Sequence, residues 1–209
     1  MRQNQAIFVV IALAAGLASG CAATPPKQTE NICAIFDEYP GWYDDARKAE
    51  RRWQTPIPVQ IAIIRQESGF RHNVKPPRDW FLGFIPLPRS SSAYGYAQAQ
   101  DPAWSDYRDA TGRRWAQRSN IEDALDFIGW YNDVSHKRLG IPKSDAERLY
   151  LAYHEGHGGY SRGSYRGKSG LQNIAKRVDR NARIYTEQLK GCEDRFRCRR
   201  FWQIWPFCR

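Results

Sequence analysis

Residues 55–69 read TPIPVQIAIIRQESG, and this stretch decides the fold. Thr55-Pro56 has the form of a helix cap followed by a proline at the first helical position, and Gly69 ends the segment. Isoleucines recur between them at helical spacing, at Ile57, Ile61 and Ile64. Because most of the other positions are apolar too, we expect a helix that is buried on most of its surface.

Three further segments begin with a capping box, in which Ser or Thr is followed three residues later by Glu or Gln. The boxes are Ser119 with Glu122, Ser144 with Glu147 (its helix running to Gly156), and Ser169 with Gln172. A shorter helix is expected over 102–109, ending before Gly112, and residues 79–96 are expected to form a loop or a small hairpin. The predicted fold class is all-α, or α with a minor β element.

The composition is that of a folded and strongly basic protein. Aromatic residues make up 13% of the 209 residues, and the formal net charge is +10. This length suits one domain with a leader and a tail. A basic surface attracts nucleic acid, anionic lipid or carboxylate-bearing cell wall. These charges are scattered along the chain, which is equally typical of a solvated surface.

The first 20 residues are expected to be a signal peptide. Arg2 supplies a positive start, and residues 6–18 are apolar apart from a glycine, a run too short to span a membrane. The sequence LASGC ending at Cys21 resembles a bacterial lipobox, in which the cleaved chain begins at a lipidated cysteine. We favour a lipid anchor on Cys21 over an ordinary cleaved signal, with residues 21–31 as a tether. Ala22, where an Asp would signal retention, predicts the outer membrane.

Four cysteines remain beyond Cys21, and an even number behind a secretion signal predicts two disulfides. Of the three pairings, we favour Cys33 with Cys192 and Cys198 with Cys208. The first pair would join the ends of a globular domain over 32–192. The second would staple a basic, aromatic tail over 193–209, which could instead lie on a membrane or extend a cleft.

Glu67 is the polar residue at the exit of the buried helix, directly before Ser68 and Gly69. A carboxyl held there would be dry on one side and face a cleft on the other, and desolvation raises its pKa. A general acid that protonates a sugar oxygen needs such a shift. Taken alone, Glu67 would more simply be a surface glutamate at a helix end.

Glu67-Ser68 is followed by three other short motifs: Gly95-Tyr96-Ala97-Gln98, then Ala152-Tyr153, then Tyr185 in a late helix. Each is weak alone, but in this order, over residues 45–190, they resemble the lytic transglycosylase family with the lysozyme-like SLT domain. The resemblance implies a lysozyme-like fold that cleaves peptidoglycan glycan strands. Cleavage between N-acetylmuramic acid and N-acetylglucosamine would then form a 1,6-anhydro ring, with no cofactor.

The resemblance also implies roles for individual side chains. Glu67 would be the single catalytic acid and base, and Ser68 would orient the scissile sugar. Gln98 would hydrogen-bond in the cleft, and Tyr153 would turn its hydroxyl toward the glutamate. Tyr185 lies on a predicted apolar stripe, so core packing is as good an interpretation as a site role.

The chain departs from the family pattern in three places. The usual Gly-Leu-Met-Gln is Gly95-Tyr96-Ala97-Gln98, and the usual Ala-Tyr-Asn is Ala152-Tyr153-His154. The span from Glu67 to Gly95 is also longer than in typical members. We expect a divergent branch in which the first change reshapes a subsite wall.

His154-Glu155-Gly156-His157 invites a metal interpretation, but the spacing differs from His-Glu-x-x-His and Gly156 should end the helix. We therefore expect no metal ion, and place His154 and Glu155 near the cleft as hydrogen-bonding groups. The glycine-rich stretch 156–170 is expected to be a mobile loop. Its cations would meet stem-peptide carboxylates or simply be solvated: Arg162, Arg166 and Lys168.

The sequence thus predicts a periplasmic, lipid-anchored lytic transglycosylase whose partners are peptidoglycan and, through the anchor, a membrane. Two alternatives are a hydrolytic muramidase on the same fold and a non-catalytic peptidoglycan-binding lipoprotein. A nucleic-acid partner is not expected, because the chain has a secretion signal and no recognised nucleic-acid motif.

Overall fold

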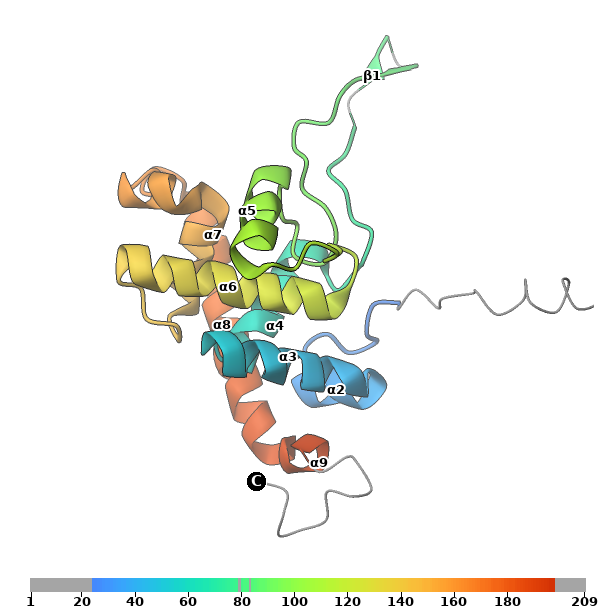
Figure 1. Cartoon of the computed structure of the whole chain (residues 1–209), viewed down its shortest axis with the longest axis vertical. Coiled ribbons are helices and arrows are strands. Elements are labelled where there is room, and N and C mark those ends of the chain that lie inside the picture. The colour runs from blue at the N-terminus through green and yellow to red at the C-terminus, as the bar shows by residue number, and fades with distance from the viewer. Residues whose placement is uncertain (1–23, 79, 83, 198–209) are drawn as a thin grey trace, which may run out of the picture.

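A computed structural model describes residues 24–197 apart from 79 and 83. The expected signal peptide, Cys21 and the Cys198–Cys208 pair lie outside the described residues. The described part is mostly helical, which confirms the predicted class (Figure 1). In chain order the elements are α2 (Ile32–Glu38), α3 (Pro40–Trp53), α4 (Ile57–Ser68), β1 (Trp80–Phe81), β2 (Ile85–Pro86), α5 (Asp101–Thr111), α6 (Ile121–Leu139), α7 (Ala146–Ser161), α8 (Ser169–Cys192) and α9 (Asp194–Arg197).

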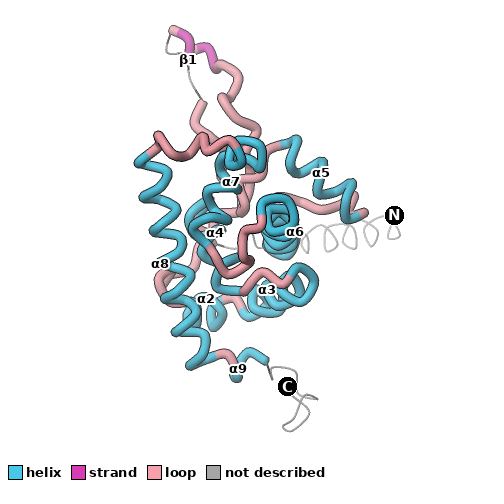
Figure 2. The backbone as a smooth tube through the Cα atoms, turned by 90° about the vertical axis from the view of Figure 1, so that its left-hand side faces the viewer, coloured by secondary structure: helices cyan, strands magenta, loops and turns pink. Residues whose placement is uncertain are grey.

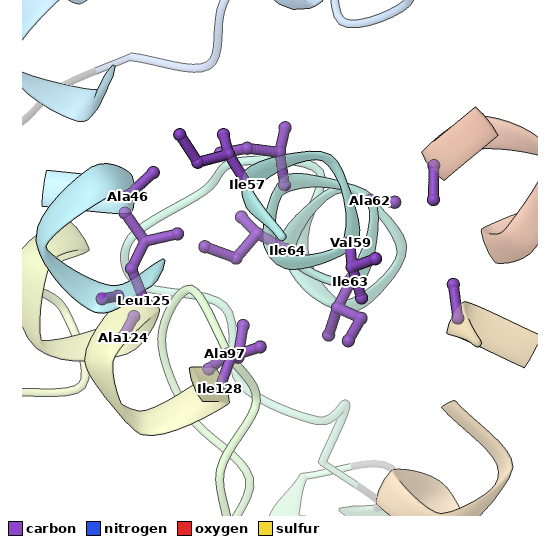
Figure 3. Close-up of a cluster of buried hydrophobic side chains, with 14 of the residues drawn as sticks. Ala46, Ile57, Val59, Ala62, Ile63, Ile64, Ala97, Ala124, Leu125 and Ile128 are labelled. Carbon is purple, nitrogen blue, oxygen red and sulfur yellow. The ribbon is translucent and has the colours of Figure 1, made fainter. Parts of the chain in front are cut away.

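Helix α4 is the centre of the core, as its sequence predicts. Nine of its 12 residues are buried, and its side chains point outward on several sides toward neighbouring helices (Figure 3). The helices packed on it are α3, α6 and α8. A helix that is apolar all round needs such cover, and the surrounding helices supply it.

Two predicted helix starts are wrong by one residue. Asn120, not Ser119, caps α6 and accepts a hydrogen bond from the Asp123 amide. Asp145, not Ser144, caps α7 and accepts from the Arg148 amide. Asn and Asp cap helices at least as well as Ser, so the neighbouring residue takes the position.

The other two predicted caps also fail. Thr55 is buried, and α4 begins at Ile57 after Pro56, with a second proline in its first turn. Helix α8 begins at Ser169 without a side-chain cap, and Gln172 donates instead to the carbonyls of Tyr165 and Arg166.

The remaining boundaries are close to expectation. Helix α5 covers 101–111, slightly more than the predicted 102–109, and ends at Gly112. The stretch 79–96 contains the small hairpin, in which β1 and β2 pair antiparallel. The hairpin projects from the helical body on two extended segments (Figures 1 and 2). Within the described residues, no helix is long and apolar enough to cross a bilayer.

The Cys33–Cys192 disulfide is present, with 6.1 Å between the two Cα atoms, and it confirms the predicted pairing. It joins α2 to the end of α8. Next to it, the Ile32 amide donates to the Gln188 side chain. Phe196, the first aromatic residue of the predicted tail, is buried against α2 and α3, so the tail begins inside the core.

Replacing both bridging cysteines, as Cys33→Ala with Cys192→Ala, is expected to lower the melting temperature by about 5–10 °C. The bridge closes a loop of 159 residues, for which the chain-entropy model gives at most about 5 kcal/mol. The measurement is thermal unfolding by circular dichroism with and without a reducing agent. In the double variant the reducing agent should have little further effect; an unchanged melting temperature would contradict the prediction.

Candidate active site

Glu67 lies one residue before the end of α4, and its side chain is only partly exposed. In the described part of the chain no ion pair includes it. The cation two residues earlier, Arg65, instead pairs with Glu30 at 3.0 Å. Because the Glu67 carboxyl is desolvated without a compensating cation, its pKa is raised to about 7.

Tyr150 of α7 lies beside the Glu67 carboxyl as a hydrogen-bonding group, and it lowers the pKa of Glu67 against the larger effect of burial. Burial, and then the charge of Glu67, raises the pKa of the Tyr150 hydroxyl. Sequence reasoning missed Tyr150. Its position three residues before Tyr153, on the same face of a helix, is the signal that could have found it.

Tyr153 lies close enough to Glu67 for the carboxylate charge to act on its hydroxyl, and the hydrogen bond of that hydroxyl goes to the backbone. It donates to the Ala97 carbonyl at 2.5 Å. Its ring meets Tyr131 edge-on, with ring centroids 5.0 Å apart. Burial, followed by the negative charge of Glu67, raises its pKa well above the usual value. Tyr153 therefore ties α7 to the turn that contains Ala97.

The turn over residues 94–99 is fixed by backbone geometry. Gly95 has a φ of +79°, and a Cβ there would lie 2.0 Å from the Arg118 carbonyl oxygen, so only glycine fits. The Gln98 side-chain nitrogen donates to the carbonyls of Val74 (3.0 Å) and Gly95 (2.8 Å). Gln98 itself has a φ of +47°, a conformation that is uncommon outside glycine.

The expected effect of Tyr96 and Ala97 on a subsite wall is not seen. Both side chains are buried, and the ring of Tyr96 meets Trp42 edge-on at 5.8 Å. The change from the usual motif therefore alters core packing under the turn. The residues of the turn that line the neighbouring cavity are Gln98 and Ala99.

A cavity of about 300 Å³ lies between this turn, α6 and α7. It brings together four of the predicted site residues: Gln98, Tyr153, His154 and Glu155. Aromatic rings of Phe127 and Tyr131 form part of its wall. Glu67 is not among the lining residues, but its charge reaches Tyr153, which is.

Glu155 is held as an ion. Its side chain is 4% exposed, and both carboxylate oxygens accept from Lys168, at 2.8 and 2.9 Å. Ser164 and His154 also contact it. Lys168 and then Ser164 lower the pKa of Glu155 to about 2. Lys168 is thus paired with Glu155, while its side chain remains 53% exposed at the surface.

Gly156 breaks α7, with φ 70° and ψ 159°, a combination that is essentially limited to glycine. The chain then resumes a helical turn to Ser161, so 156–170 is less of a loop than expected. His157, beyond the break, stacks on Tyr131 and contacts the Ser135 hydroxyl at 3.0 Å. In the described residues, no cluster of three or more His, Cys, Asp or Glu side chains could hold a metal.

Besides Glu67, two predicted site residues do not line the cavity. Ser68 is buried, and its hydroxyl donates back to the Ile64 carbonyl at 3.2 Å. Tyr185 is fully buried; its hydroxyl donates to the Thr29 carbonyl and accepts from Arg65. Of the two interpretations of Tyr185, the geometry supports the packing role.

The chain was compared with family models, with curated proteins and with solved structures. No curated protein and no solved structure matches the chain. The family model described as the transglycosylase SLT domain matches residues 9–192, most of the 209-residue chain. The chain therefore belongs to the transglycosylase SLT domain family.

Proposed function

We propose that the protein is a peptidoglycan lytic transglycosylase that uses Glu67 as its single acid and base. Membership of the family supports peptidoglycan cleavage of this type in general. The observation that carries the specific proposal is the Glu67 carboxyl, desolvated at the end of α4 with a pKa of about 7. About half of such carboxyls hold a proton at neutral pH, which suits a group that both gives and takes one.

The reaction needs one carboxyl acting twice. Protonated Glu67 gives its proton to the oxygen that links N-acetylmuramic acid to N-acetylglucosamine. The bond between this oxygen and the anomeric carbon of N-acetylmuramic acid then breaks. Positive charge develops at the anomeric carbon, where the sugar's acetamido oxygen can stabilise it. Ionised Glu67 then takes the proton of the 6-hydroxyl, whose oxygen bonds to the anomeric carbon and closes the 1,6-anhydro ring.

The neighbours of Glu67 suit these two steps. The Tyr150 hydroxyl stabilises the ionised carboxylate without adding positive charge, so the proton stays transferable. The side-chain nitrogen of Gln98 donates to two backbone carbonyls. Within the described residues no hydrogen bond reaches its side-chain oxygen, which we assign to a sugar hydroxyl or amide. The aromatic rings of Phe127 and Tyr131 give part of the cavity wall an apolar surface.

Hydrolysis is the alternative, and it commonly uses a second carboxylate to activate water. Glu155 is the carboxylate in the cavity lining, but Lys168 and Ser164 occupy its oxygens. A base with a pKa of about 2 is also a poor proton acceptor at neutral pH. The intramolecular route, which needs no such base, therefore fits this site better.

We further propose that Cys21 is lipidated and that the domain works from the outer membrane in the periplasm. The support is the sequence LASGC after a charged start and an apolar run. Family membership is consistent with a periplasmic substrate.

Glu67→Gln is expected to lower cleavage of purified sacculi by at least about a hundredfold, the share of a general acid–base group. Mass spectrometry of the products should show anhydro ends with the native chain. Glu187→Gln, which removes an exposed carboxyl on α8, is the matched control and should leave activity unchanged. Native activity in Glu67→Gln would refute the assignment, and reducing ends in place of anhydro ends would identify a hydrolase.

Relative to the native chain, Glu67→Gln should become more stable as the pH rises. Between pH 4.5 and about 7 the folded chain keeps the Glu67 proton that the unfolded chain has released. The native free energy of unfolding therefore falls across this window, by up to about 3 kcal/mol. Denaturant unfolding should show Glu67→Gln nearly equal to native at about pH 4 and more stable at about pH 8. A difference that does not change with pH would contradict the raised pKa.

The variants Tyr150→Phe and Tyr153→Phe are expected to distinguish the roles of the two tyrosine hydroxyls. Loss of the Tyr150 hydrogen bond should raise the pKa of Glu67 further, so the alkaline limb of kcat/KM shifts to higher pH. Tyr153→Phe removes the contact with Ala97 and should lower the rate without unfolding the protein and with a smaller shift of that limb. Equal limbs in both variants would remove Tyr150 from the mechanism.

A further inference from the structure

The hairpin of β1 and β2, with its return segment, carries most of the large hydrophobic side chains that are exposed in the described chain. Six large hydrophobic side chains are exposed in the described residues. Four of the six lie on this hairpin and its return segment: Leu82, Phe84, Ile85 and Leu87. Leu82 and Phe84 are 69% and 70% exposed. Such a concentration of apolar side chains on one projecting element marks an interaction surface.

Basic residues flank this apolar tip. Arg78 precedes β1 and Arg89 follows Leu87, with the exposed Lys75 further back. Over 75–89 there are three cations and one acidic residue, Asp79, which gives a net charge of 3 − 1 = +2. Arg89 is held in place by a hydrogen bond to the Pro76 carbonyl at 3.1 Å, so the two extended segments are tied together below the tip.

We propose that this hairpin inserts its apolar tip into the surface of a bilayer that contains anionic phospholipid. Leu87 and Arg89 are two residues apart, about 7 Å along an extended chain. The headgroup layer of a bilayer is about 5–8 Å thick on each side of the hydrocarbon core. Side chains of the tip can therefore reach the acyl region while the flanking cations meet the phosphates.

The sequence of the hairpin argues against a protein strand as its partner. Prolines stand on both segments, at 76, 77, 86 and 88, and lack the amide needed to pair with an added strand. Charge complementarity, on the other hand, selects an anionic surface.

Site-specific photo-crosslinking in the full chain tests the proposal. A photoreactive residue is introduced as Phe84→p-benzoylphenylalanine or, as the matched control, as Trp115→p-benzoylphenylalanine; Trp115 is 91% exposed and lies outside the hairpin. Both proteins are mixed with vesicles of phosphatidylethanolamine with roughly a quarter phosphatidylglycerol. Both keep the same amino terminus, so any anchoring through it is common to the two.

On illumination, position 84 should capture several-fold more phospholipid than position 115. Arg78→Gln, made in the Phe84-substituted chain, should reduce this capture about fivefold in the anionic vesicles, the share of one cation near the surface. Equal capture at the two positions would overturn the proposal. So would crosslinks from position 84 to a second copy of the chain, or to glycan strands when sacculi are added.

Discussion

The Glu67 carboxyl loses water because the helix that carries it is almost fully enclosed. Nine of the 12 residues of α4 are buried, and the carbonyls at a helix end disfavour a nearby negative charge. A cation beside Glu67 would cancel this effect. Arg65 is instead held by Glu30 and the Tyr185 hydroxyl, and Arg177 by the Gln66 side chain. Both cations next to Glu67 in the chain or in space are therefore engaged by other partners.

The surroundings of two glutamates near the cavity shift their pKa values in opposite directions. Burial raises the pKa of Glu67 to about 7, whereas Lys168 and Ser164 lower that of Glu155 to about 2. Such divergence assigns roles, because only the first group can exchange a proton near neutral pH. Glu155 instead braces the break at Gly156, where it joins α7 to the segment before α8.

The sequence predicts those features that depend on local pattern. The buried α4, its end at Gly69, the helical class and the Cys33–Cys192 pair all follow from periodicity, turn residues or cysteine count. The contacts around Glu67 do not follow from local pattern, because they depend on which face of α7 packs toward the end of α4. The one-residue errors at Ser119 and Ser144 have a similar origin: adjacent residues cap equally well, and tertiary packing chooses between them.

The altered motif at 95–98 shows how a change in the core can leave a site's geometry in place. Tyr96 packs on Trp42, which in turn stacks on Phe70, the second residue after the end of α4. The ring of Tyr96 therefore links the turn to the segment that leaves Glu67. Because Gly95 and Gln98 fix the backbone of that turn, the Ala97 carbonyl is held where Tyr153 can donate to it. At this turn the chain differs from the family pattern in the packing beneath it, whereas the second change, His154, lines the cavity itself.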